Sequence, residues 1–229
     1  MDAVANRRLV KNYDRAAWFY ETSAQLFSAG QIRASKKHSV NQMKAGDRAI
    51  FLGVGTGDEV VLAARRGVHV TCVDISSGML DRLRHRLDRA GMTAEILCQN
   101  AFEHDRLGFY DVCATNYFLN VFPEREMVKM LTHAASLVRP GGKLTIADVA
   151  LPQGTWPARF FNIVYLKSAM ATFWMMGLVP WHGNYDYASY FPQAGVTLDH
   201  IRFFRLFKSG PVLFQTLVAK RPAGGRQAV

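Results

Sequence analysis

The stretch Ala49-Ile50-Phe51-Leu52-Gly53-Val54-Gly55-Thr56-Gly57 decides the fold of this chain of 229 residues. Its first four residues predict a buried strand, and three glycines at alternate positions follow directly. The residues behind them repeat apolar side chains at helical spacing, so the glycines lie between a strand and a helix. Backbone amides can approach a ligand there, because no side chain blocks the way. Glycine also serves such turns for steric reasons alone, so both interpretations stay open at this point.

A second strand ends at an acidic residue. Val70-Thr71-Cys72-Val73 predicts the strand, and Asp74 follows it. Ser76 or Ser77 is suited to cap the N-terminus of the next helix, which ends near Gly91. A carboxylate after the second strand can accept hydrogen bonds from both hydroxyls of an adenosine ribose. The position of Asp74 therefore favours a nucleoside ligand at the glycine loop.

Strands and helices continue to alternate up to about residue 150, which predicts an α/β fold with a parallel sheet. Apolar runs predict further strands at residues 94–98, 111–115 and 143–149. A helical pattern follows Pro123, and Arg139-Pro140-Gly141-Gly142 predicts a turn that ends this helix before the fifth strand. Residues 152–192 form an insert rich in methionine and aromatic side chains, and residues 200–207 and 212–218 predict a closing hairpin.

Three segments together carry a resemblance to a known family: the glycine loop, Val73-Asp74-Ile75-Ser76-Ser77-Gly78-Met79-Leu80, and Arg139-Pro140-Gly141-Gly142-Lys143-Leu144. They resemble the class I S-adenosylmethionine-dependent methyltransferases, over about residues 12–150 and the final hairpin. The resemblance implies a Rossmann-like fold with a seven-stranded, mostly parallel sheet. It also implies an antiparallel last strand, helices on both faces and an aromatic-rich helical cap insert. S-adenosylmethionine is the implied cofactor.

The resemblance implies roles for individual residues as well. Gly53 and Gly55 would lie against the methionine part of the cofactor, and Asp74 would hold the ribose. Gly57 would belong to the same cofactor-binding loop. Ile75 would pack on the adenine. Asn100 and Ala101 would lie at the adenine edge. Many relatives have Asp where Asn100 stands, but an Asn carbonyl can still accept from the adenine amino group.

One departure from the family concerns the cofactor's ammonium group. Most relatives have an acidic residue two positions before the first glycine, and this chain has Phe51 there. Asn116 is a candidate substitute acceptor. Otherwise the amino group is held less tightly or is uncharged.

The N-terminal segment Asn12-Tyr13-Asp14-Arg15-Ala16-Ala17-Trp18-Phe19-Tyr20 resembles the tyrosine-rich lid helix of the quinone- and lipid-methylating branch of this superfamily. The resemblance implies that Tyr13 lies near the cofactor's carboxylate and Tyr20 close to the reaction centre. An amphipathic helix whose aromatic side chains only pack is the alternative.

We expect a single domain with five parts. These are an N-terminal helical lid (1–47), a cofactor-binding core (48–150), a substrate cap (151–195), a closing hairpin (196–220) and a tail (221–229).

The reacting end of the site is expected after the fourth strand, where open α/β folds place their ligands. Asn116 and Tyr117 would border the methionine moiety there. Aromatic faces stabilise a sulfonium cation, so Tyr117, Trp181 and Tyr185 are candidate catalytic residues. His182 is a candidate general base, with an ordinary hydrogen-bonded histidine as the alternative.

Composition limits the partners. The net charge of +10 favours anionic ligands, and it is compatible with peripheral contact with an anionic membrane, but no basic and aromatic strip indicates a specific nucleic-acid site. The histidines show no metal-ligand spacing. The oligomeric state is not indicated. The apolar stretch 160–181 is interrupted by polar residues and glycine, so a pocket lining suits it better than a membrane span.

The cysteines Cys72, Cys98 and Cys113 have no CxxC spacing and fall in strand-like runs. This pattern predicts buried, reduced thiols. Residues 1–10 lack the apolar core of a signal peptide, so we expect a cytoplasmic protein.

Two reactions fit these features. The first is methyl transfer to a small, largely apolar acceptor. The second is cyclisation, in which the cofactor's own amino group attacks its side chain to form azetidine-2-carboxylate and release methylthioadenosine. Phe51 in place of an acid is compatible with the second.

Overall fold

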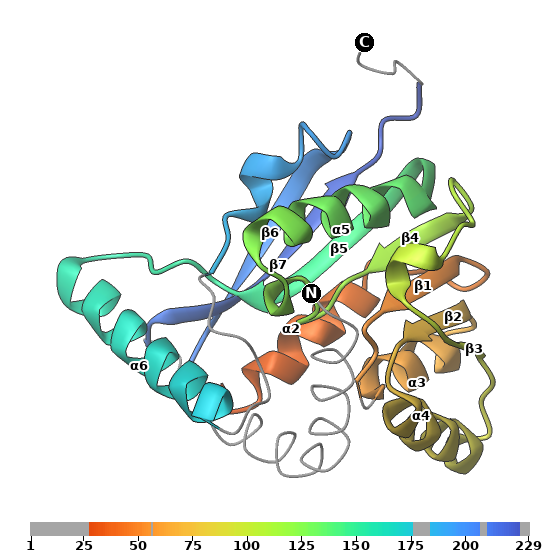
Figure 1. Ribbon diagram of the computed structural model, residues 1–229, viewed down its shortest axis with the longest axis horizontal. Coiled ribbons are helices and arrows are strands. Elements are labelled where there is room, and N and C mark those ends of the chain that lie inside the picture. The colour runs from red at the N-terminus through yellow and green to blue at the C-terminus, as the bar shows by residue number, and fades with distance from the viewer. Residues whose placement is uncertain (1–27, 56, 176–183, 207–209, 225–229) are drawn as a thin grey trace.

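The computed structural model describes residues 28–55, 57–175, 184–206 and 210–224. Their centre is a seven-stranded sheet with the order β3-β2-β1-β4-β5-β7-β6 (Figure 1). The strands are β1 (Arg48–Leu52), β2 (His69–Asp74), β3 (Glu95–Cys98), β4 (Tyr110–Ala114), β5 (Val138–Val149), β6 (Thr197–Arg205) and β7 (Val212–Lys220). Only β7 runs against its neighbours, β5 and β6, so the predicted fold class is confirmed.

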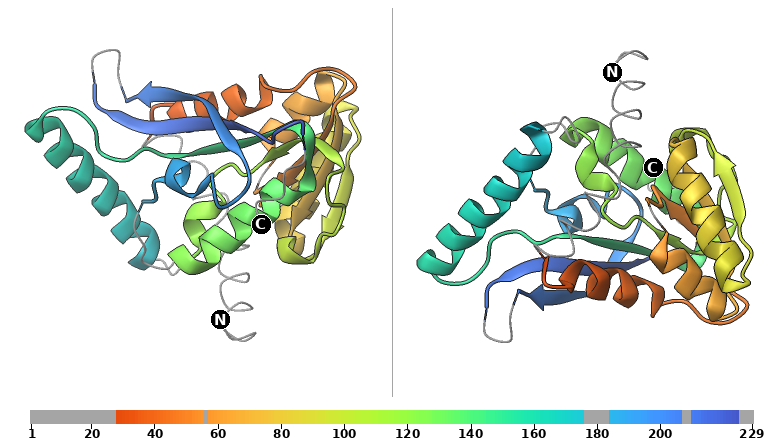
Figure 2. Two further views of the ribbon diagram at one scale, coloured as in Figure 1. Left: turned by 90° about the horizontal axis from the view of Figure 1, so that it is seen from above. Right: turned by 90° about the horizontal axis from the view of Figure 1, so that it is seen from below.

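Helices cover both faces of the sheet. The helices are α2 (Gln31–Val40), α3 (Asp58–Arg65), α4 (Ser77–Ala90), α5 (Glu124–Leu137) and α6 (Trp156–Met175). Figure 2 shows α2 and α5 on opposite sides of the sheet. Two buried apolar clusters match this arrangement, one between the sheet and α5 and the other between the sheet and the helices α3 and α4. The sheet is therefore buried on both faces, as parallel sheets are.

The predicted helix boundaries around α4 are confirmed. The side chain of Ser76 accepts from the amide of Met79 at 3.2 Å, which satisfies one of the amides left open at a helix start. Gly91 ends the helix with φ of 63°, in the left-handed region that favours glycine.

Two expectations about the strands are wrong. Residues 139–142 do not form a turn, because β5 begins at Val138 and runs through them. The amide of Gly141 donates to the carbonyl of Arg221, and the amide of Arg221 donates to the carbonyl of Gly142. Cys98 is exposed, whereas Cys72 and Cys113 are buried. Cys98 ends β3, which lies at the edge of the sheet and has a neighbouring strand, β2, on one side only.

The insert is divided between the surface and the core. The side chains of Trp156, Phe160 and Phe161 on α6 are exposed. Tyr185 and Tyr187, further along the insert, belong to the core cluster under α5. Within the described residues no helix has the length and apolarity that crossing a bilayer requires.

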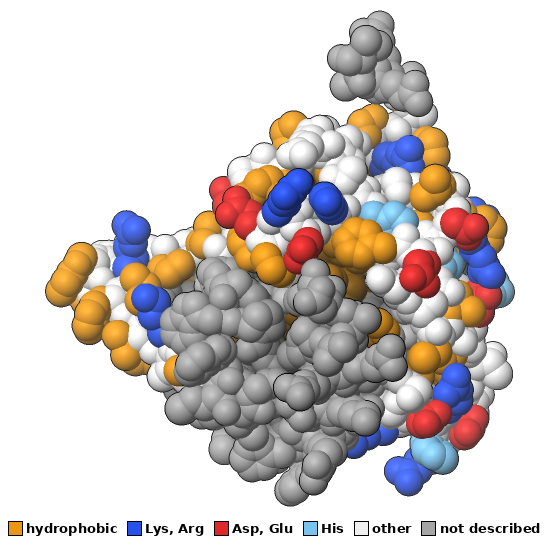
Figure 3. Space-filling model, in the orientation of Figure 1, with side chains coloured by type: hydrophobic (Ala, Val, Ile, Leu, Met, Phe, Trp, Pro, Cys, Tyr) orange, Lys and Arg blue, Asp and Glu red, His pale blue; other side chains and the backbone are white. Residues whose placement is uncertain are grey.

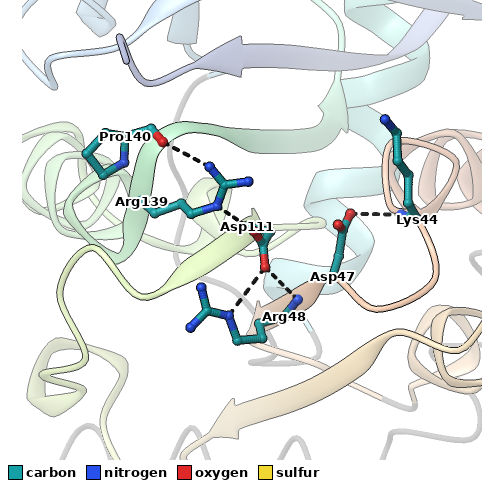
Figure 4. Close-up of polar contacts among 6 residues, drawn as sticks. All are labelled: Lys44, Asp47, Arg48, Asp111, Arg139 and Pro140. Atoms are coloured by element: carbon teal, nitrogen blue, oxygen red, sulfur yellow. Dashed lines mark hydrogen bonds and ion pairs between the residues drawn. The ribbon is translucent and has the colours of Figure 1, made fainter. Parts of the chain in front are cut away.

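An ionic cluster joins the amino ends of three strands. The carboxylate of Asp111 in β4 accepts from the backbone amide of Arg48 at 2.8 Å and from the guanidinium groups of Arg48 and Arg139 (Figure 4). Burial alone would raise the pKa of Asp111, but these bonds outweigh it and hold the pKa below its ordinary value. One carboxylate thus connects β1, β4 and β5 at the edge opposite the glycine loop.

We predict that Asp111→Ala lowers the free energy of unfolding by about 1–2 kcal/mol, because it removes charge-assisted bonds whose arginine partners are nearly half exposed. Urea unfolding measures the change. Asp81→Ala is the control, since Asp81 forms an exposed pair with Arg84 and its loss should cost less than about 0.5 kcal/mol. Equal effects of the two substitutions would contradict a structural role for Asp111.

Candidate functional site

The carboxyl ends of three adjacent strands bring the predicted site residues to one edge of the sheet. Leu52 pairs with Val73 between β1 and β2, and Phe51 pairs with Ala114 between β1 and β4. The glycine loop follows β1, Asp74 ends β2, and Asn116 lies two residues beyond the end of β4. The sequence therefore predicted correctly that these segments meet.

The three loop glycines differ in what surrounds the position of the absent side chain. A Cβ atom at Gly53 would lie 2.1 Å from the ring of Phe118, and one at Gly57 would lie 2.4 Å from Cδ1 of Leu83. Both glycines therefore make room for packing inside the protein. A Cβ atom at Gly55 would meet no described atom within 4 Å. Gly55 has φ of 52°, in the left-handed region that favours glycine, and the open position of its absent side chain leaves room for a ligand.

Asp74 connects the glycine loop to the start of α4. Its Oδ2 accepts from the amide of Gly55 at 3.3 Å, and its Oδ1 accepts from the amide of Ser76 at 2.9 Å. A carboxylate has about four lone-pair positions, so it can accept from ribose hydroxyls as well. The predicted ribose contact is compatible with this geometry.

The expected adenine contacts lie beside Asp74. Ile75 exposes 45% of its surface, which leaves a face that a ring can cover. Asn100 follows β3, and its Oδ1 accepts from the amide of Phe102 at 3.1 Å. Ala101 begins the short 3-10 helix that this bond caps. The second lone pair of the Asn100 carbonyl is geometrically separate from this bond.

Asn116 is buried at the same edge. Neither its Oδ1 nor its Nδ2 has a hydrogen-bond partner within the part of the chain that the structure describes. Buried polar atoms without partners destabilise a protein, so they indicate a ligand or another group that satisfies them. This orphaned amide fits the polar amino-acid end of S-adenosylmethionine.

Tyr117 follows in a strained backbone conformation, with φ of 54°. Its amide donates to the carbonyl of Ala147, and its hydroxyl lies 2.9 Å from Oγ of Ser35 in α2. The Nζ of Lys36 lies 6.0 Å from the centre of the ring. Sequence reasoning missed Ser35 and Lys36, because nothing in the sequence of α2 marks it as a neighbour of the segment that follows β4.

Phe51, which replaces the family's acidic residue, is buried in the cluster on the α3 and α4 side of the sheet. Its side chain contributes to the core there, which accounts for an apolar residue at this position.

Tyr185 is buried, and its hydroxyl donates to the carbonyl of Phe122 at 2.9 Å. Burial, followed by the nearby charge of Glu124, raises the pKa of Tyr185 above its ordinary value, so its phenol stays protonated at neutral pH. Tyr185 packs in a different cluster from Tyr117. Tyr13, Tyr20, Trp181 and His182 lie outside the described residues. The catalytic roles of Tyr117, Tyr185, Trp181 and His182 and the cofactor contacts of Tyr13 and Tyr20 stay predictions.

A buried carboxylate that sequence reasoning missed lies near the end of β5. Asp148 is fully buried, and it accepts from the hydroxyl of Tyr187 at 2.7 Å and from Nδ2 of Asn120 at 2.8 Å. Burial raises the pKa of Asp148 to about 6, although the bonds from Tyr187, Val149 and Asn120 oppose the shift. The available signal was one acidic residue inside the apolar run of the fifth strand.

Metal chemistry has no support in the described residues, among which no group of three or more His, Cys, Asp or Glu side chains could hold a metal ion.

Comparisons with known proteins agree with this arrangement. Residues 50–142 match the family model described as a methyltransferase domain. The chain is 26% identical to demethylmenaquinone methyltransferase of Clavibacter sepedonicus, over 68% of this chain and 63% of the relative. It is 30% identical to phosphatidylethanolamine N-methyltransferase of Cereibacter sphaeroides, over 53% of this chain and 61% of the relative. The chain thus spans less than two thirds of the length of these relatives.

Solved structures share the fold. The chain resembles Burkholderia thailandensis 1,6-didemethyltoxoflavin-N1-methyltransferase, solved with 1,6-didemethyltoxoflavin and S-adenosylhomocysteine, with a TM-score of 0.66 and 15% identity over 97% of this chain and 92% of that chain. A SAM-dependent methyltransferase from Methanosarcina mazei gives a TM-score of 0.63 and 16% identity, over 80% of this chain and 96% of that chain. At such identities the likeness concerns the fold.

We predict that Asp74→Ala weakens S-adenosylmethionine binding by more than about tenfold, because the ribose hydroxyls and the Gly55 amide lose a charged acceptor. Calorimetric titration measures the affinity. Asp74→Asn keeps one acceptor oxygen and should bind with intermediate affinity. Asp88→Ala removes an exposed carboxylate of α4 and should bind like the unchanged protein. Unchanged affinity of the Asp74→Ala protein would exclude the ribose contact.

A second prediction concerns Asp148. Its folded pKa lies above its unfolded value, so its contribution to stability is present below about pH 4 and is lost as the pH rises through about 6. The loss amounts to about 3 kcal/mol, at roughly 1.4 kcal/mol for each pH unit between the two pKa values. Asp148→Asn does not titrate and can keep the bonds to Asn120 and Tyr187. Relative to the unchanged protein, this variant should gain stability between pH 4 and pH 7.

Urea unfolding at several pH values tests this expectation. Asp81→Asn, at an exposed position, serves as the control and should show no such gain. If the stability difference between the Asp148→Asn protein and the unchanged protein is the same at every pH, Asp148 does not titrate in this range.

Proposed function

Because the chain belongs to the class I S-adenosylmethionine-dependent methyltransferase superfamily, we propose that it transfers a methyl group from S-adenosylmethionine to a small, largely apolar acceptor. One observation carries the proposal: the open backbone at Gly55, the carboxylate of Asp74 and the orphaned amide of Asn116 meet at one edge of the sheet. These groups suit the different parts of an adenosyl amino acid.

S-adenosylmethionine, when bound, supplies a methyl group activated by a positive sulfur. The residues of this chain would then act mainly by positioning, since in-line attack on such a methyl group needs little acid-base help. Asp74 would accept from the ribose hydroxyls, and Ile75 would cover the adenine. Asn116 would offer its amide to the amino-acid end, which Phe51 cannot do from the core. The ring of Tyr117 would face the positive sulfur.

The names of relatives support an apolar acceptor. Two of the matched proteins are named for demethylmenaquinone and for phosphatidylethanolamine, and a third, from Coxiella burnetii and 25% identical, is named for ubiquinone biosynthesis. Quinones with isoprenoid tails and phospholipids are both membrane-borne molecules. For a neutral oxygen or nitrogen acceptor, His182 is the residue we propose to receive the proton.

The cyclisation alternative rests on Phe51. Its burial in the core accounts for that residue without any change of reaction, so methyl transfer is the function that the site supports best.

The test identifies the nucleoside product. We expect pure protein with S-adenosylmethionine alone to be inactive, and we expect S-adenosylhomocysteine to form when a demethylated quinone or an ethanolamine phospholipid is added in detergent. Chromatography and mass spectrometry measure both the nucleoside and the methylated acceptor. Asp74→Ala should lower turnover at limiting cofactor, and the exposed-site control Asp88→Ala should not.

If methylthioadenosine forms without any acceptor, the reaction is cyclisation and not methyl transfer. Binding of S-adenosylmethionine without any product from apolar or polar acceptors would contradict both reactions.

A further inference from the structure

Helix α6 carries an exposed apolar stripe. Trp156, Phe160 and Val164 expose 76%, 57% and 51% of their surfaces, and Ile163 is exposed too. These four residues follow the helical spacing i, i+4, i+7 and i+8, so they share one side of the helix. The rings of Trp156 and Phe160 stack with their centres 5.7 Å apart. Single exposed apolar residues are common on proteins, but a continuous set of large ones indicates a docking surface.

The other side of α6 is fixed to the sheet. Asn162 is fully buried, and its Nδ2 donates to the carbonyl of Val212 at 3.0 Å. Tyr165 and Leu166 pack against the apolar cluster that contains Leu213 and Phe214 of β7. The exposed stripe therefore points away from the protein because its opposite face is held, and not because the helix lacks a fixed position.

The charges on α6 are all positive. Arg159 and Lys167 are its only ionisable residues besides Tyr165, both are exposed, and the sequence contains no acidic residue between Asp148 and Asp186. Lys167 follows Phe160 and Ile163 by seven and four residues and so lies on the stripe itself. Figure 3 shows hydrophobic and positive side chains together on the part of α6 that this view displays, with no acidic side chain among them.

We infer that α6 docks on an anionic lipid bilayer, with Trp156, Phe160, Ile163 and Val164 in the interfacial layer and Arg159 and Lys167 at the lipid phosphates. Aromatic and aliphatic side chains beside basic residues are the composition that binds helices in the plane of a bilayer. A second copy of this chain fits the surface less well. Each copy carries +10 net charge, and pairing two stripes would bring two Lys167 side chains together.

The position of α6 gives this docking a use. α6 follows the carboxyl end of β5 and is bonded to the first residue of β7, so it stands at the edge of the sheet where the glycine loop and Asp74 also lie. Figure 1 shows α6 extending beyond the end of the β5 and β7 pair. Docking by α6 therefore brings this edge of the protein toward lipid. That use rests on the proposed function, because only an apolar acceptor needs collection from a membrane, whereas the docking itself does not require the function.

Flotation of the full chain with vesicles tests the inference in the absence of cofactor and acceptor. One set of vesicles contains phosphatidylcholine alone, and the other contains phosphatidylglycerol as well. We expect about tenfold or stronger partitioning to the anionic vesicles, reduced by high salt. Trp156→Ser combined with Phe160→Ser should reduce binding by about tenfold or more. Leu107→Ser, which removes an exposed apolar side chain elsewhere, should not.

Two pairs of charge-reversal substitutions distinguish binding by the surface of α6 from binding by the overall positive charge of the protein. Arg159→Glu with Lys167→Glu should abolish the preference for anionic vesicles. Arg125→Glu with Lys129→Glu makes the same change of net charge at exposed positions of α5. This control pair should preserve most of the preference for anionic vesicles. Equal losses in the two pairs would overturn the assignment to α6. So would a stripe-dependent dimer, seen by light scattering as a mass that falls in the Trp156→Ser and Phe160→Ser protein.

Turnover with a detergent-solubilised acceptor keeps the two proposals apart. We expect the α6 variants to retain that turnover, since the altered side chains are exposed and α6 meets the sheet through other residues. Vesicle binding without any methyl transfer would leave the docking intact and refute the proposed function. Methyl transfer without vesicle binding would support the proposed function and refute the docking.

Discussion

The hydrogen bond from the Gly55 amide to the carboxylate of Asp74 joins the two loops on which the candidate site depends. These loops follow β1 and β2, whose parallel ladder fixes where each loop begins. The second oxygen of Asp74 binds the amide of Ser76, so one side chain orients the glycine loop and the first turn of α4 together. A carboxylate held by two amides is already ordered before any ligand arrives. Binding then requires less ordering of the protein, which lowers the free-energy cost of association.

The glycine triplet combines two physical needs that the sequence does not separate. Gly53 and Gly57 lack side chains because Phe118 and Leu83 occupy the space, while Gly55 lacks one where no described atom stands. The steric and the ligand-binding interpretations of the triplet are therefore both compatible with the structure, at different positions. The pattern points to a ligand because it occurs together with Asp74, and Asp74 contacts Gly55, the glycine that faces open space.

The sequence predicted the strands of the core well because each central strand is an apolar run with a glycine or a polar residue at its end. It failed where the deciding partner is distant in the chain. Residues 139–142 pair with Arg221, and Cys98 is exposed because β3 has a neighbour on one side only. Asp148 was missed for the same reason, since Tyr187, which binds its carboxylate, lies 39 residues further along. The roles of Tyr13, Tyr20, Trp181 and His182 stay predictions, because these residues lie outside the described part of the chain.

The insert after β5 has one part whose side chains are buried in the core and another, α6, that is buried on one side only. Tyr185 and Tyr187 reach the core under α5 and are buried there, with Tyr187 bonded to Asp148. Among its described side chains, α6 contacts the sheet at β7 through those at 162, 165 and 166. The remaining stripe has no apolar partner among the described residues, so hydration of its rings opposes the folded state unless a non-aqueous surface covers them. A basic protein whose apolar helix lies beside its candidate site meets such a surface most readily at an anionic bilayer, where the attraction of charge and the burial of the rings act together.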